Sequence, residues 1–197
     1  IAVSKLAINT TLSLRIGWAN ELSATADKYG ADRTAVLSAV QSDPRIGSGY
    51  MVPGWPPSGP CLPRDLETWI ELSEGVLAKA LAGTHESHAE SLIDKTKTLL
   101  ASKNKHKVTV LGLVYNPKAL DITNSQGIAI ARELQSVGMD IRVYDPASMW
   151  FSEHITDLAV ASSVEDALLG TEAVVIATPW PEFRSIDFGE RFVVDLR

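Results

Sequence analysis

The first thirty residues carry apolar side chains at helical spacing. The residues that form this stripe are Val3, Leu6, Ala7, Leu14, Trp18, Leu22 and Ala26. Residues three and four positions apart share one face of a helix, so the pattern predicts one long helix. Gly30 is typical of the position just beyond a helix C-terminus. A second, short helix is expected after Asp32. Asp43-Pro44 ends it, because a residue before proline disfavours the helical conformation.

The segment from residue 43 to residue 63 is too rich in proline and glycine to form a regular element. It contains six of the ten prolines and four glycines, so it is either an ordered loop or a linker. The helical pattern resumes at Leu66, breaks near Gly83 and resumes again from Glu86 to Leu100. The polar run 101–107 then indicates a domain boundary.

The second half of the chain changes to short apolar runs. Strands are expected at 108–113, 141–144, 173–177 and 192–195, with helices at about 124–137 and 164–168. The first run is continuously apolar, as expected of a strand buried on both faces. Strands that alternate with helices predict a parallel sheet with right-handed crossovers. The predicted fold class is α/β, with a helical dimerisation region (1–103) followed by a Rossmann-like parallel-sheet domain (104–197).

Ligands of such sheets bind at the carboxyl ends of the strands, here near Gly112 to Asn116, Asp145-Pro146 and Thr178-Pro179. The turn after the first strand reads Leu111-Gly-Leu-Val-Tyr-Asn-Pro and not G-x-G-x-x-G. Without that glycine pattern the backbone cannot approach a pyrophosphate closely. If the protein uses NAD, we therefore expect the NAD domain elsewhere. The fold alone fits equally well a stable α/β domain with another function.

Composition and charge exclude several classes of protein. The 197 residues are 45% hydrophobic and 21% charged, an ordinary globular composition, and the net charge of −6 argues against a nucleic-acid surface. No apolar run approaches the roughly 20 residues of a membrane span, so no membrane partner is expected. A single cysteine excludes an internal disulfide and fits a reducing cytoplasm. The chain opens in the middle of a helical pattern without Met, which we interpret as a cut inside a larger protein.

Cys61 is the strongest candidate for chemistry. A lone cysteine is more often a small buried hydrophobic residue than a nucleophile. Cys61, however, lies in the proline- and glycine-rich loop just before a helix, with Arg64 and Asp65 three and four residues further on. A helix N-terminus and a nearby guanidinium both favour the thiolate, which is the reactive form. The sequence context therefore raises the case for a nucleophile.

The residues around Cys61 resemble the UDP-glucose and GDP-mannose dehydrogenase family. The family signature D-P-R-I-G-x-x-Y-x-x-P-G…G-x-C-x-P-[KR]-D is matched by Asp43, Pro44, Arg45, Ile46, Gly47, Tyr50, Pro53, Gly54, Gly59, Cys61, Pro63 and Asp65. Upstream, Lys5 to Asn9 and Asn20-Glu21 resemble the K-x-x-x-N and N-E of its long central helix. Downstream, its C-terminal domain is similar at Leu111-Gly-Leu, Asp121, Ser125, Tyr144-Asp-Pro146, Thr178, Trp180 and Phe183. The resemblance covers essentially the whole chain.

The resemblance implies an NAD-dependent enzyme that oxidises the C6 alcohol of a nucleotide sugar twice, to a carboxylate. Cys61 would trap the intermediate aldehyde as a thiohemiacetal and carry the later thioester. Lys5 and Asn9, one helical turn apart, would steady the oxyanion, and Asp65 is the candidate base or water-positioning group. Each has a simpler alternative: a solvated lysine, an amide bonded to backbone, and an acid in the first turn of its helix.

The family's substrate and cofactor contacts transfer to further positions. Arg45 resembles the arginine that reaches the nucleotide phosphates across a dimer interface, and a loop salt bridge is its alternative. Tyr50, Gly54, Gly59 and Asn116 are the other candidate substrate contacts, and Arg64 is the candidate cofactor contact. Trp180 and Phe183 are expected to pack in the core. The long apolar first helix predicts a homodimer, and no metal ligand set is expected.

Several positions depart from the family pattern. Pro56 and Ser58 replace two glycines of the loop, Asn116 stands where a lysine usually meets the substrate, and Thr123 replaces an arginine. Lys118 offers a cation two residues from Asn116. The losses indicate a divergent branch, with a non-catalytic sugar-nucleotide sensor or assembly module as the competing hypothesis.

Overall fold

The computed structural model describes residues 2–196. The chain divides into two compact units, the first ending at Glu90 and the second beginning at Ser91. Each unit has its own core, so we describe each by itself. None of the helices within residues 2–196 combines the length and the apolar character of a membrane span.

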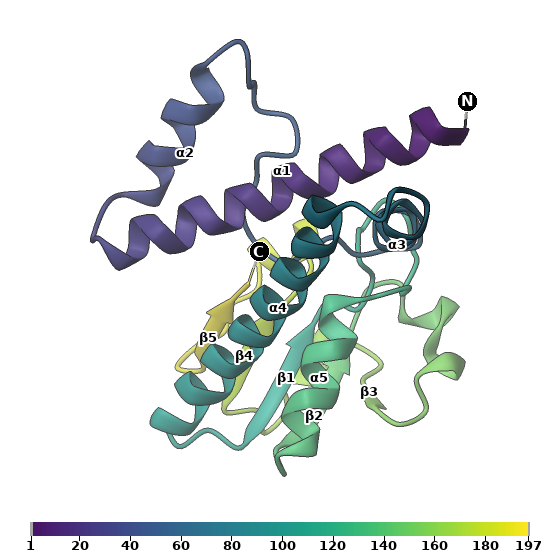
Figure 1. Cartoon of the computed structure of the whole chain (residues 1–197). Coiled ribbons are helices and arrows are strands. Elements are labelled where there is room, and N and C mark those ends of the chain that lie inside the picture. Colours follow the sequence, from purple (N-terminus) through teal and green to yellow (C-terminus); the bar gives the residue numbers. More distant parts are fainter. Residues whose placement is uncertain (1, 197) are drawn as a thin grey trace. The chain divides into compact units, whose positions relative to one another are not determined.

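The helical unit is built on α1 (Ala2–Lys28), the long first helix that the sequence predicts. α2 (Arg33–Ser42) and α3 (Leu62–Ser73) both pack against α1 (Figure 1). The side chain of Asp32 accepts hydrogen bonds from the backbone of Thr34 and Ala35, and this N-cap fixes the start of α2. α2 ends at Ser42, directly before Asp43-Pro44, as expected.

The predicted helix break near Gly83 is wrong. α4 (Val76–Ser102) runs through Gly83 without interruption. The break lies between α3 and α4, at Glu74, which adopts a left-handed conformation (φ 50°) and ends α3. A glycine inside a helix costs only about 1 kcal/mol relative to alanine, which a long packed helix tolerates. The N-terminal part of α4 belongs to the helical unit, and its C-terminal part belongs to the second unit.

The second unit contains a five-stranded parallel sheet, which confirms the α/β prediction. The strand order is β3-β2-β1-β4-β5, and every neighbouring pair is parallel. The strands are β1 (Lys107–Leu111), β2 (Asp140–Tyr144), β3 (Ala159–Val160), β4 (Ala173–Ile176) and β5 (Phe192–Asp195). The helices are α5 (Gln126–Ser136) and α6 (Val164–Leu168), with 3-10 turns at Ser148–Trp150, Ser152–His154 and Pro181–Arg184. β3 and the 3-10 turns are elements that the sequence analysis missed.

The centre of the sheet is its most apolar part. β1 lies between β2 and β4, and all four residues of β4 are buried. After β1 the chain adds β2 and β3 on one side of β1, and then β4 and β5 on its other side. The strand order therefore reverses at β1. Open parallel sheets bind ligands at the carboxyl ends of the strands at such a reversal.

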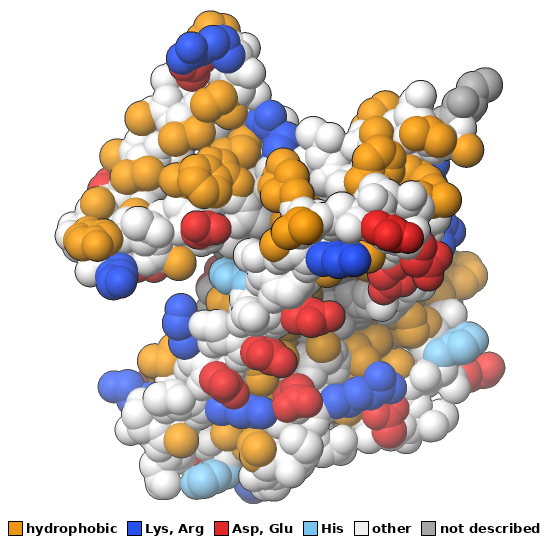
Figure 2. Space-filling model, viewed as in Figure 1, with side chains coloured by type: hydrophobic (Ala, Val, Ile, Leu, Met, Phe, Trp, Pro, Cys, Tyr) orange, Lys and Arg blue, Asp and Glu red, His pale blue; other side chains and the backbone are white. Residues whose placement is uncertain are grey.

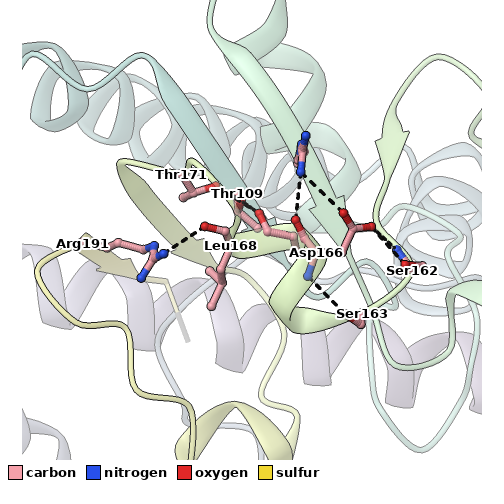
Figure 3. A network of polar contacts seen from close by, with 9 residues as sticks. Thr109, Ser162, Ser163, Asp166, Leu168, Thr171 and Arg191 are labelled. Atoms are coloured by element: carbon pink, nitrogen blue, oxygen red, sulfur yellow. Dashed lines mark hydrogen bonds and ion pairs between the residues drawn. The ribbon is translucent and has the colours of Figure 1, made fainter.

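A network of hydrogen bonds holds α6 against the sheet (Figure 3). The hydroxyl of Thr109 on β1 donates to the carbonyl of Ala167 over 2.6 Å. Arg142 on β2 donates to the carbonyl of Asp166 over 2.9 Å, and Arg191 donates to the carbonyl of Leu168 over 3.0 Å. These bonds add side-chain donors to the last carbonyls of a short helix and tie that helix end to β1, β2 and Arg191.

Candidate functional site

The proline-rich segment between α2 and α3 is an ordered loop. On α1, the guanidinium of Arg15 donates to three carbonyls of this loop: those of Ile46, Gly47 and Gly49. One planar guanidinium offers five N–H donors in a fixed arrangement, so it holds these carbonyls in a fixed relation to one another. The sequence analysis left a loop and a linker open, and these contacts identify a loop.

Further contacts hold the middle of the loop. Gln41 at the end of α2 donates to the carbonyl of Met51 over 2.7 Å, and the Met51 side chain is buried against Ala19 and Leu37. The backbone N–H of Gly54 donates to the side-chain oxygen of Asn20 over 2.7 Å. Backbone groups that leave regular structure need such partners when they are shielded from water. The loop is therefore fastened at several successive points.

Cys61 lies at the end of this loop and directly precedes α3. It is the N-cap residue of α3, its side chain makes no capping hydrogen bond, and the residue is exposed. Its carbonyl accepts from the backbone N–H of Asp65 over 2.9 Å, the first hydrogen bond of the helix. The position agrees with the predicted loop-to-helix junction. It leaves the thiol accessible to a reagent or a substrate.

Asp65, one turn into α3, is the centre of a polar cluster. Its Oδ2 atom lies 2.6 Å from Lys5 Nζ and accepts from Asn9 Nδ2, also over 2.6 Å. Its Oδ1 atom accepts from Arg64 Nε and Nη2 over 3.2 and 3.1 Å. The structure thus brings together four of the predicted site residues: Lys5 and Asn9 from α1, and Arg64 and Asp65 from α3.

The Asp65 carboxylate is buried and ionised. Its side chain is only 3% exposed, whereas the Lys5 side chain is 52% exposed. The hydrogen bond from Lys5 is the main cause that holds the pKa of Asp65 below its ordinary value, with Asn9 and Arg64 adding to it against the effect of burial. A carboxylate whose pKa lies below its ordinary value is a weak base at neutral pH. The arrangement favours an organising role, in which Asp65 fixes Lys5 and Asn9 beside the start of α3.

Arg45 and Tyr50 lie in the loop before Cys61 and take no part in the hydrogen bonds of the Asp65 cluster. Arg45 is exposed and forms a two-point ion pair with Asp43, with contacts of 2.9 and 2.6 Å. This pair raises the pKa of Arg45 and lowers the pKa of Asp43. Tyr50 is half exposed and has a positive φ of 59°, which is unusual for a residue with a side chain. Both side chains are therefore exposed on the surface of the helical unit.

Gly54 and Gly59, the glycines expected to contact substrate, have φ angles of 146° and 79°. Side-chain-bearing residues rarely adopt these angles, so the path of the loop requires glycine at both positions. Their place in the family signature therefore has a local structural reason, independent of any contact with substrate.

Asn116 lies in the second unit, at the carboxyl edge of the sheet, and helps to line a cavity of about 420 Å³. The lining residues are Asn116, Pro117, Lys118, Pro179, Trp180, Pro181 and Glu182. These residues follow β1 and β4, the strands at which the order reverses. The cavity lies at the edge of the sheet where a ligand is expected from the sequence. Lys118 contributes a cation to it, next to the amide of Asn116.

Asp145, which directly follows β2, organises one side of this cavity. Its buried Oδ2 atom accepts from the backbone N–H groups of Leu113 and Val114 over 2.6 and 3.1 Å, and from Trp180 Nε1 over 3.0 Å. Its Oδ1 atom accepts from the backbone of Ala147 over 2.8 Å. One internal carboxylate therefore occupies the amide groups of the turn after β1. Trp180 is held by this contact, and Phe183 is buried in the core as expected.

Two glycines allow close packing here: Gly112 directly after β1 and Gly127 in the first turn of α5. A Cβ atom on Gly127, in the first turn of α5, would lie 1.9 Å from the carbonyl oxygen of Gly112. Gly112 itself has a φ of 96°, and a Cβ atom there would lie 2.5 Å from Thr178. α5, β1 and the segment after β4 therefore approach as closely as their backbones allow.

Three residues that were not predicted from the sequence hold the loop in place: Arg15, Gln41 and His88. His88 on α4 donates from Nε2 to the carbonyl of Gly54 over 2.9 Å, since a carbonyl can only accept. The one available signal was Arg15, a charged residue inside an otherwise weakly charged helix. The partners of Arg15 lie 31 to 34 positions away, and no local pattern identifies them.

Comparisons with known proteins agree with the two units. Residues 2–87 match the central domain of the UDP-glucose/GDP-mannose dehydrogenase family, and residues 109–197 match the family's UDP binding domain. The chain is 30% identical to UDP-glucose 6-dehydrogenase YwqF of Bacillus subtilis, over 91% of the chain and 42% of that protein. It is 32% identical to UDP-glucose 6-dehydrogenase AglM of Haloferax volcanii, over 98% of the chain and 47% of that protein.

A solved structure shows the same fold. The UDP-glucose dehydrogenase of the hyperthermophilic archaeon Pyrobaculum islandicum superposes with a TM-score of 0.86 at 30% identity, over 99% of this chain and 47% of that one. The chain spans about half the length of the curated relatives it matches. The two matched domains account for nearly all of its residues, and the chain belongs to the UDP-glucose/GDP-mannose dehydrogenase family.

Proposed function

We propose that this chain supplies the covalent and nucleotide-binding parts of an NAD-dependent nucleotide-sugar 6-dehydrogenase, which oxidises the C6 hydroxyl of a sugar such as that of UDP-glucose to a carboxylate. The observation that carries the proposal is the cluster of Lys5, Asn9 and Asp65, because Asp65 follows Cys61 by one turn of α3. An accessible thiol beside a cation and an amide is the arrangement that covalent aldehyde chemistry needs.

The first covalent step is addition of the Cys61 thiol to the C6 aldehyde. The S–C6 bond forms, the C=O π bond breaks, and the thiol proton goes to the aldehyde oxygen, which gives a thiohemiacetal. No electrons are gained or lost in this step. It holds a reactive aldehyde in place until it is oxidised. The exposure of Cys61 at the loop-to-helix junction supports this role.

The second covalent step is hydrolysis of the Cys61 thioester. Water adds to C6, the S–C6 bond breaks, and the departing thiolate takes up one proton of the water. The other proton passes to solvent, so the product is released as a carboxylate. Negative charge develops on the oxygen of the thioester during this attack. Lys5 and Asn9 are the donors that we assign to that oxygen, since both project from the same face of α1 toward α3. Asp65 is assigned the role of holding both donors in place.

NAD is the cofactor that the family resemblance implies, and it supplies the acceptor for the two hydrides. The second unit does not fit its pyrophosphate. The N–H groups of Leu113 and Val114, which would face a phosphate, already donate to Asp145. Arg64, the candidate cofactor contact, is engaged with Asp65. We therefore assign no hydride step to the residues of this chain.

The nucleotide part of the substrate is assigned to the second unit. This assignment is supported by its match to a UDP binding domain and by the cavity lined by Asn116, Lys118 and Trp180. The cation of Lys118 is suited to a diphosphate, and the prolines and the indole are suited to apolar parts of the ligand. Asn116 replaces the usual lysine, so we assign the phosphate contact to Lys118.

A homodimer through α1 completes the proposal. Val3, Leu14 and Trp18 lie on one face of α1 and are 62, 38 and 48% exposed. Hydrophobic side chains are frequent over α1 and α2 in the space-filling view (Figure 2). A second copy of α1 would bury this face. The reach of Arg45 into the other copy is proposed on the family resemblance.

The proposal is tested by calorimetric titration of the chain with UDP-glucose, UDP and GDP-mannose, together with the rate at which iodoacetamide alkylates Cys61. We expect UDP-glucose to bind and to slow alkylation at least fivefold at saturation. UDP should bind without comparable protection, because it lacks the sugar. A folded chain that binds none of the three nucleotides would contradict the proposed function and favour neither a dehydrogenase nor a sugar-nucleotide sensor.

A further inference from the structure

The loop that carries Cys61 changes direction at Gly54, and both peptide groups that flank the Gly54 Cα atom are held by side chains. Its N–H donates to Asn20 Oδ1 over 2.7 Å, and its carbonyl accepts from His88 Nε2 over 2.9 Å. Asn20 comes from α1 and His88 from α4, so two separate helices contribute. Asn20 is 3% exposed, so its bond to Gly54 is shielded from water.

Two bonds on either side of one Cα atom restrict both backbone torsions of that residue. Gly54 has a φ of 146°, in a region that only glycine visits readily. Without side-chain contacts, a glycine is the most flexible point of a chain, and fixing it costs conformational entropy. The two bonds offset that cost at the position where the loop would otherwise bend most easily.

The segments on the two sides of Gly54 carry different candidate groups. Tyr50 lies on the N-terminal side, in the part held by Arg15 and Gln41. Cys61 lies on the C-terminal side, seven residues on, at the start of α3. A fixed Gly54 therefore sets how the substrate-facing part of the loop lies relative to the thiol. Asn20 lies on the same face of α1 as Lys5 and Asn9, so one helix face orders both the loop and the Asp65 cluster.

We infer that Asn20 and His88 are positioning residues: they fix the backbone of Gly54 and thereby hold the Cys61 loop in the geometry that receives the nucleotide sugar. This inference rests on the proposed function for the identity of the ligand. The contacts that carry it, however, are independent of any ligand. His88 acts through its Nε2–H donor, so a side chain with a donor at the same reach replaces it.

The test compares His88→Leu, which removes the donor, with His88→Gln, whose side-chain amide places a donor near the former Nε2 position. Asn20→Ala removes the other contact, and Ser87→Ala, at an exposed neighbouring position of α4, is the matched control. Two readouts are needed: hydrogen exchange of the Gly54 amide, measured by NMR, and the dissociation constant for UDP-glucose. Thermal unfolding of each variant verifies that the chain is folded.

We expect exchange of the Gly54 amide to rise at least tenfold in His88→Leu and Asn20→Ala, and UDP-glucose to bind about tenfold more weakly. His88→Gln should restore most of both values, and Ser87→Ala should match the wild type. Wild-type exchange in His88→Leu and Asn20→Ala, or faster exchange with unchanged affinity, would overturn the inference. If the folded wild type binds no UDP-glucose, the proposed function fails, while the exchange rates still decide whether Asn20 and His88 hold Gly54.

Discussion

Lys5 Nζ on α1 and Asp65 Oδ2 on α3 lie 2.6 Å apart, and this contact joins the two helices beside Cys61. The two partners differ in environment, because Lys5 is half exposed and Asp65 is buried. The Asp65 carboxylate accepts from three side chains, those of Lys5, Asn9 and Arg64, and it keeps two of these partners when Lys5 is replaced. The consequences of changing the two residues are therefore unequal.

Replacing Asp65 should cost more stability than replacing Lys5. We expect Asp65→Ala to lower the free energy of unfolding by about 2–3 kcal/mol, since hydrogen bonds to a charged group are each worth roughly 1.5–3 kcal/mol and the exposed donors are rehydrated. Lys5→Met should cost about 1 kcal/mol or less, because half of the lysine is in water. Urea unfolding followed by circular dichroism measures both. Equal losses for the two variants would argue against a central role of the carboxylate.

The helical unit should lose stability on mild acidification because of His85. Its ring is buried on α4 against Gly17, and burial lowers the pKa of His85 to about 4 from an ordinary 6.5, with His88 as a further cause. A lowered histidine pKa means that the unfolded chain binds the proton first. Stability is therefore lost as the pH falls from 6.5 toward 4, by on the order of 2 kcal/mol, and the loss levels off below that range.

The measurement is denaturant unfolding at intervals from pH 7.5 to pH 4.5, for the wild type and for His85→Leu. The slope in this window should be smaller in the variant, since leucine does not titrate. Asp65 titrates outside this window: its pKa is lowered from the ordinary 3.8, so its contribution to stability is present above 3.8 and is lost only at lower pH. An unchanged slope in His85→Leu would refute the assignment.

Gly127→Ala should strongly destabilise the sheet unit. The new Cβ atom would lie 1.9 Å from the carbonyl oxygen of Gly112, which belongs to the backbone and cannot turn aside. We expect a loss of about 3 kcal/mol or more, or failure of the unit to fold. Gly83→Ala is the matched control, because Gly83 is also helical and no atom lies within 4 Å of its Cβ position. That change should be neutral or stabilise by up to about 1 kcal/mol, as read from thermal melts.

Asp145→Asn should disturb the cavity at the carboxyl edge of the sheet. The Asp145 carboxylate accepts four hydrogen bonds through its two oxygens. Asparagine keeps only one of these oxygens, and its N–H₂ group would face N–H donors in place of the other. We expect a loss of about 2 kcal/mol and a red-shifted Trp180 emission as the indole loses its acceptor. Trp180→Phe in the Asp145→Asn background identifies the fluorescence that belongs to Trp180. An emission spectrum unchanged by Asp145→Asn would contradict the role of Asp145.

The periodic elements of this fold could be predicted from the sequence because their signals are local. α1, α2 and the four longer strands follow from the spacing of apolar side chains and from Asp32 and Pro44. The helix break was misplaced because Gly83 is a common breaker, whereas Glu74 takes the left-handed conformation with no sequence signal. β3, with two residues, is too short for any periodicity.

The residues of the candidate site likewise divide into those that the sequence predicts and those that only tertiary contacts reveal. Cys61, Lys5, Asn9 and Asp65 were found from their spacing and from a family resemblance, and the structure brings the last three together. Arg15 and His88 escaped prediction because their hydrogen-bond partners lie 31 to 34 positions away, a relation that only tertiary packing creates. The role of Asp145 escaped for the same reason, since its partners come from three separate turns.

The most direct test of the covalent chemistry is a carbon-13 NMR spectrum of the chain with UDP-glucose that is labelled and oxidised to the aldehyde at C6. Thiohemiacetal formation needs no hydride acceptor, so this step is open to the chain alone. We predict a new C6 signal of a carbon bonded to sulfur, separate from the aldehyde and its hydrate, in the wild type and absent in Cys61→Ala. Only free aldehyde and hydrate with the folded wild type, or the same new signal from Cys61→Ala, would contradict the assignment of Cys61 as the nucleophile.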